Sequence, residues 1–199
     1  MDRREMTETQ GDVADLAEPL FELDRKARDV LHPHHRTPLV RGLRVIGEAG
    51  DQPQLRLLCA GVALVGLMRG DAKMVRAGAR MLLAHEVATA AKSAVKASVD
   101  RWRPRSSADG KDHRPQPGGQ PAKELSSFPS GHSAGALAVA AAFAAEYPQH
   151  RTAALGAAGA IGAIQVPTCA HYPSDVLAGW TVGGVAAALV NRLFGRRGT

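Results

Sequence analysis

The sequence predicts an all-α protein, a bundle of about six helices that is embedded in a membrane. Hydrophobic residues make up 45% of the 199 residues but aromatic residues only 4%, so the apolar content is mostly Ala, Val and Leu. This composition favours helices that pack closely through small side chains. In addition, one amphipathic segment and five apolar segments have the length and spacing of helices. The chain is long enough for one compact domain with its own core.

An amphipathic helix is predicted over residues 13–31. We expect it to pack on the rest of the domain, and the alternative is a helix that lies on a membrane surface. Residues 1–54 are therefore interpreted as this helix and a linker, and residues 55–199 as the main helical domain. The apolar positions that recur at helical spacing are Val13, Leu16, Leu20, Leu23, Ala27 and Val30.

Candidate metal ligands occur in two places, and neither predicts a metal site. Pro33 interrupts the run from His32 to His35, so these histidines do not share a helical face and we expect a solvated turn. The two cysteines, Cys59 and Cys169, are not at a metal-binding spacing. We therefore expect no metal, no other cofactor and no disulfide framework.

Five apolar segments account for the rest of the bundle. They cover residues 57–68, 75–95, 134–145, 153–166 and 176–193. A membrane span needs about 20 predominantly apolar residues, and the last segment comes closest to this length. The first dozen residues are polar and charged and lack the apolar centre of a secretory signal. Any membrane insertion is therefore expected to use internal segments.

The charge of the chain predicts an anionic partner. The formal net charge is +6, which suits nucleic acid, a phospholipid surface or a phosphorylated substrate. The basic residues are not interleaved with aromatic residues that stack on bases, and no nucleic-acid-binding motif is visible. We therefore expect a phosphorylated substrate and a membrane as partners, and no nucleic acid. The sequence does not indicate an oligomeric state.

A first phosphate-binding element is predicted at the start of a loop rich in Pro, Gly and charge, which we place at residues 98–130 as an active-site loop. Lys96 is followed by Arg103 and Pro104, and the proline restricts the chain as it leaves the preceding helix. Lysine binds phosphate oxygens as a point charge and arginine as a planar fork. This pair is suited to clamping a phosphoryl group.

A second element directly precedes the apolar segment 134–145. The residues Pro129-Ser130-Gly131-His132 are expected at a helix N-terminus, where unpaired N–H groups and a partial positive charge favour anions. Gly131 lets the backbone approach a phosphate closely, and Ser130 adds a hydroxyl donor. His132 beside that phosphate is a candidate general acid.

A third element precedes the apolar segment 176–193. His171 and Asp175 lie four residues apart, and Pro173 suits the first turn of the following helix. We expect Asp175 to accept a hydrogen bond from one nitrogen of His171 and so to fix its tautomer. The other nitrogen is then free to attack phosphorus.

These three elements in this order resemble the type 2 phosphatidic-acid phosphatase superfamily of bacterial membrane-associated phosphatases, which shares its helical core and site with the vanadium haloperoxidases. The resemblance covers about residue 92 to the C-terminus. It implies that His171 is the nucleophile that forms a phosphohistidine, that Asp175 orients it and that His132 protonates the leaving group. It further implies that Lys96, Arg103, Ser130 and Gly131 hold the phosphoryl oxygens and that no metal is required.

The chain departs from the pattern of this family at one point. The family carries Ser-Arg six to seven residues ahead of its nucleophilic histidine, and the chain has Ile164 and Gln165 there. A guanidinium on the phosphate is therefore missing, and Gln165 offers only a neutral hydrogen bond. The candidates to replace it are Lys92, Arg101 and Arg105, and our preferred interpretation is that all three are solvated or structural.

The leading functional hypothesis is metal-independent hydrolysis of a phosphomonoester or diphosphate on a lipid. A soluble acid phosphatase is an alternative within the fold, and a vanadate-dependent haloperoxidase is disfavoured because vanadate would also miss the arginine. A different class is a non-catalytic membrane protein that binds a phospholipid. The segments 134–145 and 153–166 form a hairpin, which places both site loops on one side. We expect a multi-pass protein of the bacterial inner membrane whose site faces outside the cytoplasm.

Overall fold

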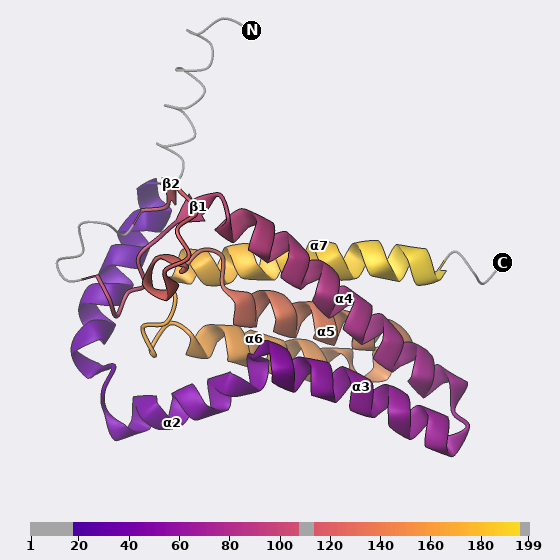
Figure 1. Cartoon of the computed structure of the whole chain (residues 1–199). Helices are drawn as coiled ribbons and strands as arrows, with labels where there is room; N and C mark the ends of the chain where they lie inside the picture. The colour runs from indigo at the N-terminus through magenta and orange to yellow at the C-terminus, as the bar shows by residue number, and fades with distance from the viewer. Residues whose placement is uncertain (1–17, 108–113, 196–199) are drawn as a thin grey trace, which may run out of the picture.

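Five long helices lie side by side and form most of the molecule (Figure 1). The structure is a computed structural model and describes residues 18–107 and 114–195. Residues 18–31 are helical as well. The labelled helices are α2 (Pro38–Gly47), α3 (Gln52–Arg69), α4 (Ala72–Lys96), α5 (Gly131–Glu146), α6 (Arg151–Ile164) and α7 (Pro173–Gly195), with short 3-10 turns η1 (His32–His34), η2 (Glu48–Gly50), η3 (Lys123–Leu125) and η4 (Pro148–His150).

The helical bundle predicted from the sequence is confirmed. Each of the five apolar segments corresponds to one helix from α3 to α7, and α7 begins at Pro173 as expected. Helix α2 was not predicted, because residues 38–47 were assigned to the linker. Its start has a local cause: Thr37 accepts a hydrogen bond from the Val40 N–H, and Pro38 occupies the first helical turn.

Helix α5 lies at the centre of the bundle and contacts α4, α6 and α7. Small residues allow this close packing. A Cβ atom on Gly183 of α7 would lie 2.3 Å from the carbonyl oxygen of Ala134 in α5. Likewise, a Cβ atom on Gly78 of α4 would lie 2.5 Å from the backbone nitrogen of Ala63 in α3. The low aromatic content of the chain therefore has a structural reason, because these helix backbones leave no room for larger side chains.

The helix at residues 18–31 packs on the domain through a polar residue. Asp24 is fully buried, whereas Leu23 is 50% exposed and Val30 is 67% exposed. Of the predicted apolar stripe, Leu20 and Ala27 are half-buried, so the docking face follows the stripe only in part, and Val13 and Leu16 lie outside the described residues. Burial of a carboxylate requires a charged or hydrogen-bonding partner, and Arg101 in the loop after α4 supplies it.

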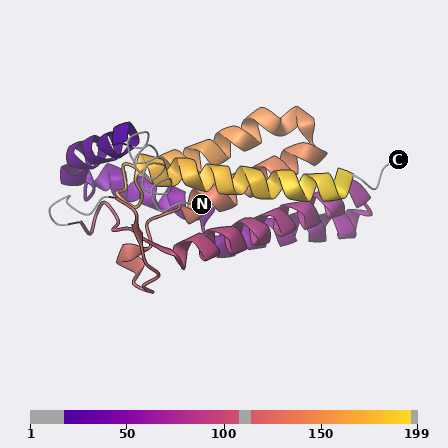
Figure 2. The same ribbon diagram turned by 90° about the horizontal axis from the view of Figure 1, so that it is seen from above.

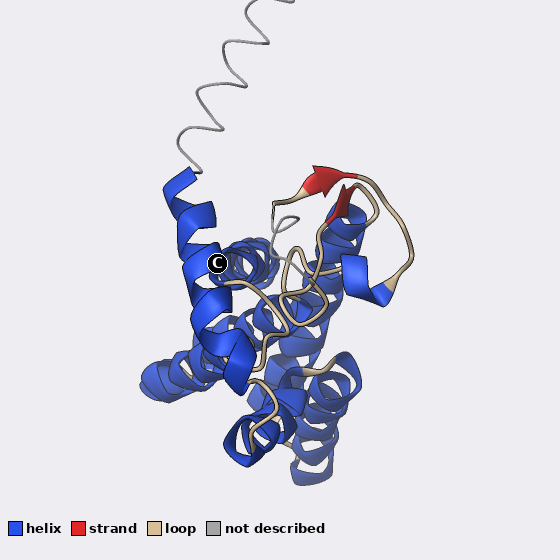
Figure 3. Ribbon diagram, turned by 90° about the vertical axis from the view of Figure 1, so that its left-hand side faces the viewer, coloured by secondary structure: helices blue, strands red, loops and turns tan. Residues whose placement is uncertain are grey.

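One end of the bundle carries the irregular parts of the chain. Figures 1 and 2 both place residues 18–31, α2 and the loop after α4 at this end. In the loop, the strands β1 (Val99–Asp100) and β2 (Gln116–Pro117) pair antiparallel, and Figure 3 shows them from this end. The two sides of the loop are also joined where the N–H of Ser127 donates to the carbonyl of Arg101. The long loop is therefore a hydrogen-bonded structure that covers one end of the helices.

Candidate active site

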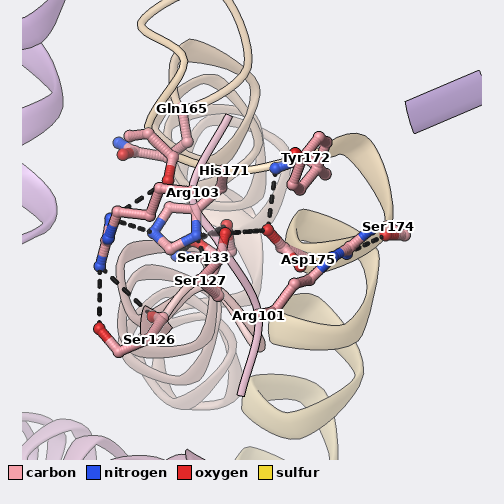
Figure 4. A network of polar contacts seen from close by, with 12 residues as sticks. Arg101, Arg103, Ser126, Ser127, Ser133, Gln165, His171, Tyr172, Ser174 and Asp175 are labelled. Carbon is pink, nitrogen blue, oxygen red and sulfur yellow. Dashed lines mark hydrogen bonds and ion pairs between the residues drawn. The ribbon is translucent and has the colours of Figure 1, made fainter. Parts of the chain in front are cut away.

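The three sequence elements meet at this end of the bundle. The first lies where α4 ends, the second where α5 begins, and the third just before α7. Residues of the loop and of the α7 start share one network of polar contacts (Figure 4). A direct backbone bond joins the last two elements, because the N–H of Ser130 donates to the carbonyl of Asp175. The fold thus brings together residues that are up to 79 positions apart along the chain, from Lys96 to Asp175.

His171 is buried, with only 2% of its surface exposed, and its ring is held in one orientation. Its Nδ1 lies 2.8 Å from the carbonyl oxygen of Ser127, which only accepts hydrogen bonds. Nδ1 therefore carries the proton. The other nitrogen, Nε2, lies 3.4 Å from Nη1 of Arg103, which only donates. The Nε2 lone pair consequently faces the cation that would hold a phosphoryl group.

Asp175 binds residues next to His171 and does not bind the histidine ring. The predicted hydrogen bond to the histidine is not formed, since Asp175 Oδ2 lies 3.7 Å from His171 Nδ1. The Oδ2 atom instead accepts from the Ser127 hydroxyl at 2.5 Å and from the Tyr172 N–H at 2.9 Å. The carboxylate therefore fixes both Ser127, whose carbonyl binds the histidine, and the turn on which the histidine lies.

The environment keeps the His171 imidazole neutral. Burial lowers its pKa to about 4, and the positive charges of Arg103 and Lys96 act in the same direction. Asp175 opposes this shift but does not cancel it. At neutral pH the ring is therefore unprotonated on Nε2, which is the state that a nucleophile requires.

His132 is paired with a carboxylate from another helix start. Its Nε2 lies 2.7 Å from Oδ1 of Asp51, the residue that precedes α3. The rings of His132 and His171 are 6.3 Å apart, centroid to centroid. The two rings are therefore neighbours at the edge of the site.

The start of α5 offers backbone donors. Ser130 caps the helix, because its hydroxyl oxygen accepts from the N–H and the hydroxyl of Ser133. Within the described part of the chain, the N–H groups of Gly131 and His132 have no hydrogen-bond acceptor. Free N–H groups in the first turn of a helix are an anion site.

Lys96 and Arg103 lie together beside His171. Lys96 Nζ donates to the carbonyl of Ser126, and Arg103 Nη2 lies 3.4 Å from the same oxygen. Arg103 also donates to the carbonyls of Lys123 and Ala170. Burial lowers the pKa of Arg103 to about 10, so it remains charged at neutral pH. Backbone carbonyls therefore position two basic side chains beside His171, and burial lowers the pKa of Lys96 to about 7.

Gln165 is buried at the end of α6. Its side-chain Nε2 donates to the carbonyl of Ile161 at 3.2 Å, within its own helix. Its backbone carbonyl accepts from the N–H groups of Ala170 and His171. Gln165 thus supports the turn that carries His171. Its assignment as a phosphate ligand stays a prediction.

The three basic residues considered as substitutes for the missing arginine lie in different surroundings. Arg101 is structural: it is fully buried and pairs with Asp24 at 2.7 Å and with Asp175 at 2.5 Å. Arg105 is half-buried and lines a separate pocket with Arg44. Lys92 is buried, with 8% of its surface exposed, so of the two roles expected for it the solvated one is excluded and the structural one stays a prediction.

Three residues of the site were missed by sequence reasoning. Asp51 and Asp24 lie far from the motifs along the chain, and no local pattern connects them with His132 or Arg101. Asp51 had one signal, since it precedes Pro53 and an apolar helix and so suits a helix start. Ser127 acts through its backbone carbonyl, and side-chain identity does not reveal that role.

Comparisons with known proteins agree with this geometry. A family model described as the PAP2 superfamily matches residues 77–199, more than half of the chain. Lipid A 1-phosphatases from Rhizobium etli and Rhizobium johnstonii are each 44% identical over 72 residues, which are 36% of this chain and 31% and 30% of those proteins. The match therefore spans about a third of these relatives. The crystal structure of a transmembrane PAP2-type phosphatidylglycerolphosphate phosphatase from Bacillus subtilis has the same fold, with a TM-score of 0.62, 20% identity and coverage of 88% of this chain and 86% of that one.

Proposed function

The chain belongs to the PAP2 superfamily, and we propose that it hydrolyses a phosphomonoester or diphosphate on a membrane lipid through a phosphohistidine at His171, without a metal. The observation that carries this proposal is the state of His171. Its Nδ1 proton is held by the Ser127 carbonyl, and its Nε2 lone pair faces Arg103. A neutral imidazole with one fixed tautomer is the form in which histidine attacks phosphorus.

The first step forms the phosphoenzyme. The Nε2 lone pair of His171 attacks phosphorus, an N–P bond forms and the bond from phosphorus to the leaving oxygen breaks. His132, in its protonated form beside Asp51, gives its proton to that oxygen, so that an alcohol or a phosphate monoester leaves. Lys96, Arg103 and the free N–H groups of the α5 start stabilise the charge on the three remaining oxygens.

The second step releases phosphate. The neutral His132 takes a proton from a water molecule, whose oxygen attacks phosphorus. The N–P bond breaks and its electron pair returns to His171 Nε2. Inorganic phosphate leaves, and both histidines have regained their initial protonation states.

An apolar pocket next to His132 supports a lipid substrate. It has a volume of about 270 Å³ and is lined only by apolar side chains of α3, α4, α5 and α6. Ile161 belongs to this lining, and a Cβ atom on Gly50 would lie 2.5 Å from Ile161 Cγ2 and 3.4 Å from His132 Cδ2. The pocket therefore begins on the leaving-group side of the site, where the acyl or prenyl chain of a lipid would lie.

A membrane location forms part of the proposal. One helix among the described residues, α7, is long and apolar enough to cross a bilayer. Large apolar side chains are also exposed on α2, α3 and α7, and a lipid environment would cover them. We propose a multi-pass protein of the bacterial inner membrane with its site outside the cytoplasm. The most exposed of these side chains are Leu39, Val45, Leu57, Leu67, Met68 and Leu193.

Labelling of one engineered cysteine tests this orientation. Gln120 is exposed in the loop of the site, whereas the native Cys59 and Cys169 are buried. We expect Gln120→Cys to react with an impermeant thiol reagent in intact cells. Reaction only after lysis would contradict the orientation, and the parent protein is the control for background labelling.

Phosphate release from a panel of substrates tests the activity. Purified protein in detergent is given phosphatidate, phosphatidylglycerol phosphate, a polyprenyl diphosphate, lipid A and p-nitrophenyl phosphate, with His171→Ala as the control. We expect release by the wild type only, and an acid-labile phosphorylated His171 in quenched reactions. Equal release by both proteins on every substrate would refute the proposal and favour a non-catalytic phospholipid-binding protein.

A paired substitution tests the apolar pocket. Leu58 is 51% exposed and lines the pocket, whereas its neighbour Leu57 is 73% exposed and does not line it. We expect Leu58→Trp to lower kcat/KM about fivefold for a long-chain lipid phosphate, because the larger ring fills the pocket. Leu57→Trp should have no such effect, and neither change should affect p-nitrophenyl phosphate. An equal effect of both changes would remove the pocket from the proposal.

A further inference from the structure

Lys92 is a buried cation without a partner. It lies on α4 one turn before Lys96, and only 8% of its surface is exposed. No hydrogen bond or ion pair of its ammonium is found among residues 18–107 and 114–195. A lysine with so little exposed surface is unusual, and an anion at its ammonium would stabilise it.

The Lys92 side chain passes close to the helix start that offers the free N–H groups. A Cβ atom on Gly131 would lie 3.4 Å from both Cδ and Nζ of Lys92. Gly131 is the first residue of α5, and its N–H and that of His132 have no acceptor in the described part of the chain. Lys92 Nζ and these N–H groups therefore lie at the same helix start, where a bound anion is within reach of both.

The described residues supply no unpaired anion at this place. Of the carboxylates of the site, Asp51 is paired with His132, Asp24 with Arg101, and Asp175 is engaged by Arg101, Ser127 and Tyr172. Lys96 and Arg103 are two more basic side chains nearby, and they contact only neutral carbonyls, a hydroxyl and the His171 ring. Like charges this close repel each other, and binding of a dianion relieves that repulsion.

We propose that Lys92 is a phosphate-binding residue that replaces the guanidinium absent at Gln165. This inference rests on the proposed function, since the anion it assigns to Lys92 is the phosphoryl group that His171 receives. Lys92 would donate to one non-bridging oxygen from the α4 side, and Arg103 would bind from the side of His171. The charge that the family supplies from the residues before its nucleophile is thus supplied here by the helix of the first motif.

Substitution of Lys92 gives the central test. We expect Lys92→Met to lower kcat/KM for p-nitrophenyl phosphate and for a lipid phosphate about 100-fold, as loss of one donor to a developing oxyanion does. Lys92→Arg should retain most of the activity. Lys73→Met is the matched control: it removes an exposed lysine at the other end of the same helix, where Nζ lies over the Tyr147 ring.

A compensating change separates a phosphate ligand from a merely structural residue. We expect Gln165→Arg to restore about tenfold of the activity that Lys92→Met loses, because it returns a guanidinium to the site. A structural role of Lys92 would give no such rescue. If Lys92→Met does not reach the helical circular dichroism of the wild type, the same comparison is made with Lys92→Gln, which keeps a polar side chain without the charge.

Two readouts keep this inference distinct from the proposed function. If the wild type is active and Lys92→Met is within about twofold of Lys73→Met, the role of Lys92 is refuted while the phosphatase proposal stands. If the wild type is no more active than His171→Ala, the phosphatase proposal fails, and calorimetry with inorganic phosphate decides about Lys92. We expect the Kd for phosphate to rise about tenfold in Lys92→Met. An unchanged Kd would overturn the inference.

Discussion

The two histidines of the site are held in different ways. His171 is enclosed by the protein and is bound at Nδ1 by a backbone carbonyl, which cannot change its charge. His132 lies on the more open side, and its Nε2 is bound by the carboxylate of Asp51, itself partly exposed to solvent. One ring is therefore fixed in a single protonation state. The other has a partner that stabilises its protonated form against burial and the neighbouring basic residues, which together lower its pKa.

This difference matches two chemical roles. A nucleophile requires one tautomer throughout the reaction, so a rigid and neutral partner suits it. A general acid that later acts as a base must gain and lose a proton in each cycle, and a carboxylate next to solvent permits both states. The four predictions below test whether the two rings differ in this way, beginning with the largest effect.

Replacement of His171 should abolish turnover. We expect His171→Ala to lower kcat at least about 1,000-fold on every substrate, because no other group presents a lone pair to phosphorus. Steady-state phosphate release measures this loss. His150→Ala, which removes an exposed histidine in the turn before α6, is the control and should be fully active. Comparable activity of the two variants would remove His171 from the role of nucleophile.

Replacement of His132 should have an effect that depends on the leaving group. We expect His132→Asn to lower kcat about 100-fold or more on an alkyl or lipid phosphate, since the alkoxide then leaves without a proton. The loss on p-nitrophenyl phosphate should be much smaller, because p-nitrophenolate leaves unprotonated. An equal loss on both substrates would contradict the assignment of His132 as general acid.

Replacement of Asp51 should give a smaller effect of the same kind. We expect Asp51→Asn to lower kcat on a lipid phosphate about tenfold and to leave hydrolysis of p-nitrophenyl phosphate nearly unchanged, because it weakens the acid without removing it. Asp71→Asn, at the start of α4, is the matched control for loss of a carboxylate that caps a helix. If Asp51→Asn affects both substrates alike, Asp51 acts on folding or binding and not through His132.

The smallest predicted effect is a shift in pH dependence. Because burial lowers the pKa of His171 to about 4, the ring stays neutral as the pH falls to about 5, and kcat/KM should decrease only as the pH approaches 4. The charge of Arg103 contributes to this lowering, so Arg103→Gln should raise the pKa and move the acidic decrease to higher pH. Profiles of kcat/KM against pH measure the shift. A shift in the opposite direction would contradict the contact between Arg103 and Nε2.

The sequence was most informative where chemistry and local structure coincide. The residues Pro129 to His132 and His171 to Asp175 lie at helix starts, and both the helices and the candidate ligands were predicted from the same few positions. The family resemblance drawn from these positions is confirmed by the match at residues 77–199. Local signals sufficed because helix starts have characteristic residues and directly offer anion-binding groups.

Contacts between distant segments could not be predicted from the sequence. The hydrogen bond of His171 was assigned to Asp175, four residues away, whereas the structure gives it to the carbonyl of Ser127. Every residue has a carbonyl, so no sequence pattern marks this one. Asp24 was similarly hidden, because the spacing of apolar residues does not mark a buried acidic residue among them. The burial of Lys92 depends on how α4 and α5 pack, which periodicity does not determine.

The buried contact between Asp24 and Arg101 bears on which parts of the chain must be inherited together. The family model matches residues 77–199, yet Asp24 and Asp51 lie before that segment and pair with Arg101 and His132 within it. A chimera that carried only the matched segment would leave a buried guanidinium with one carboxylate fewer and a histidine without its partner. Recombination would therefore tend to preserve the N-terminal helix together with the motifs, although no motif lies in it.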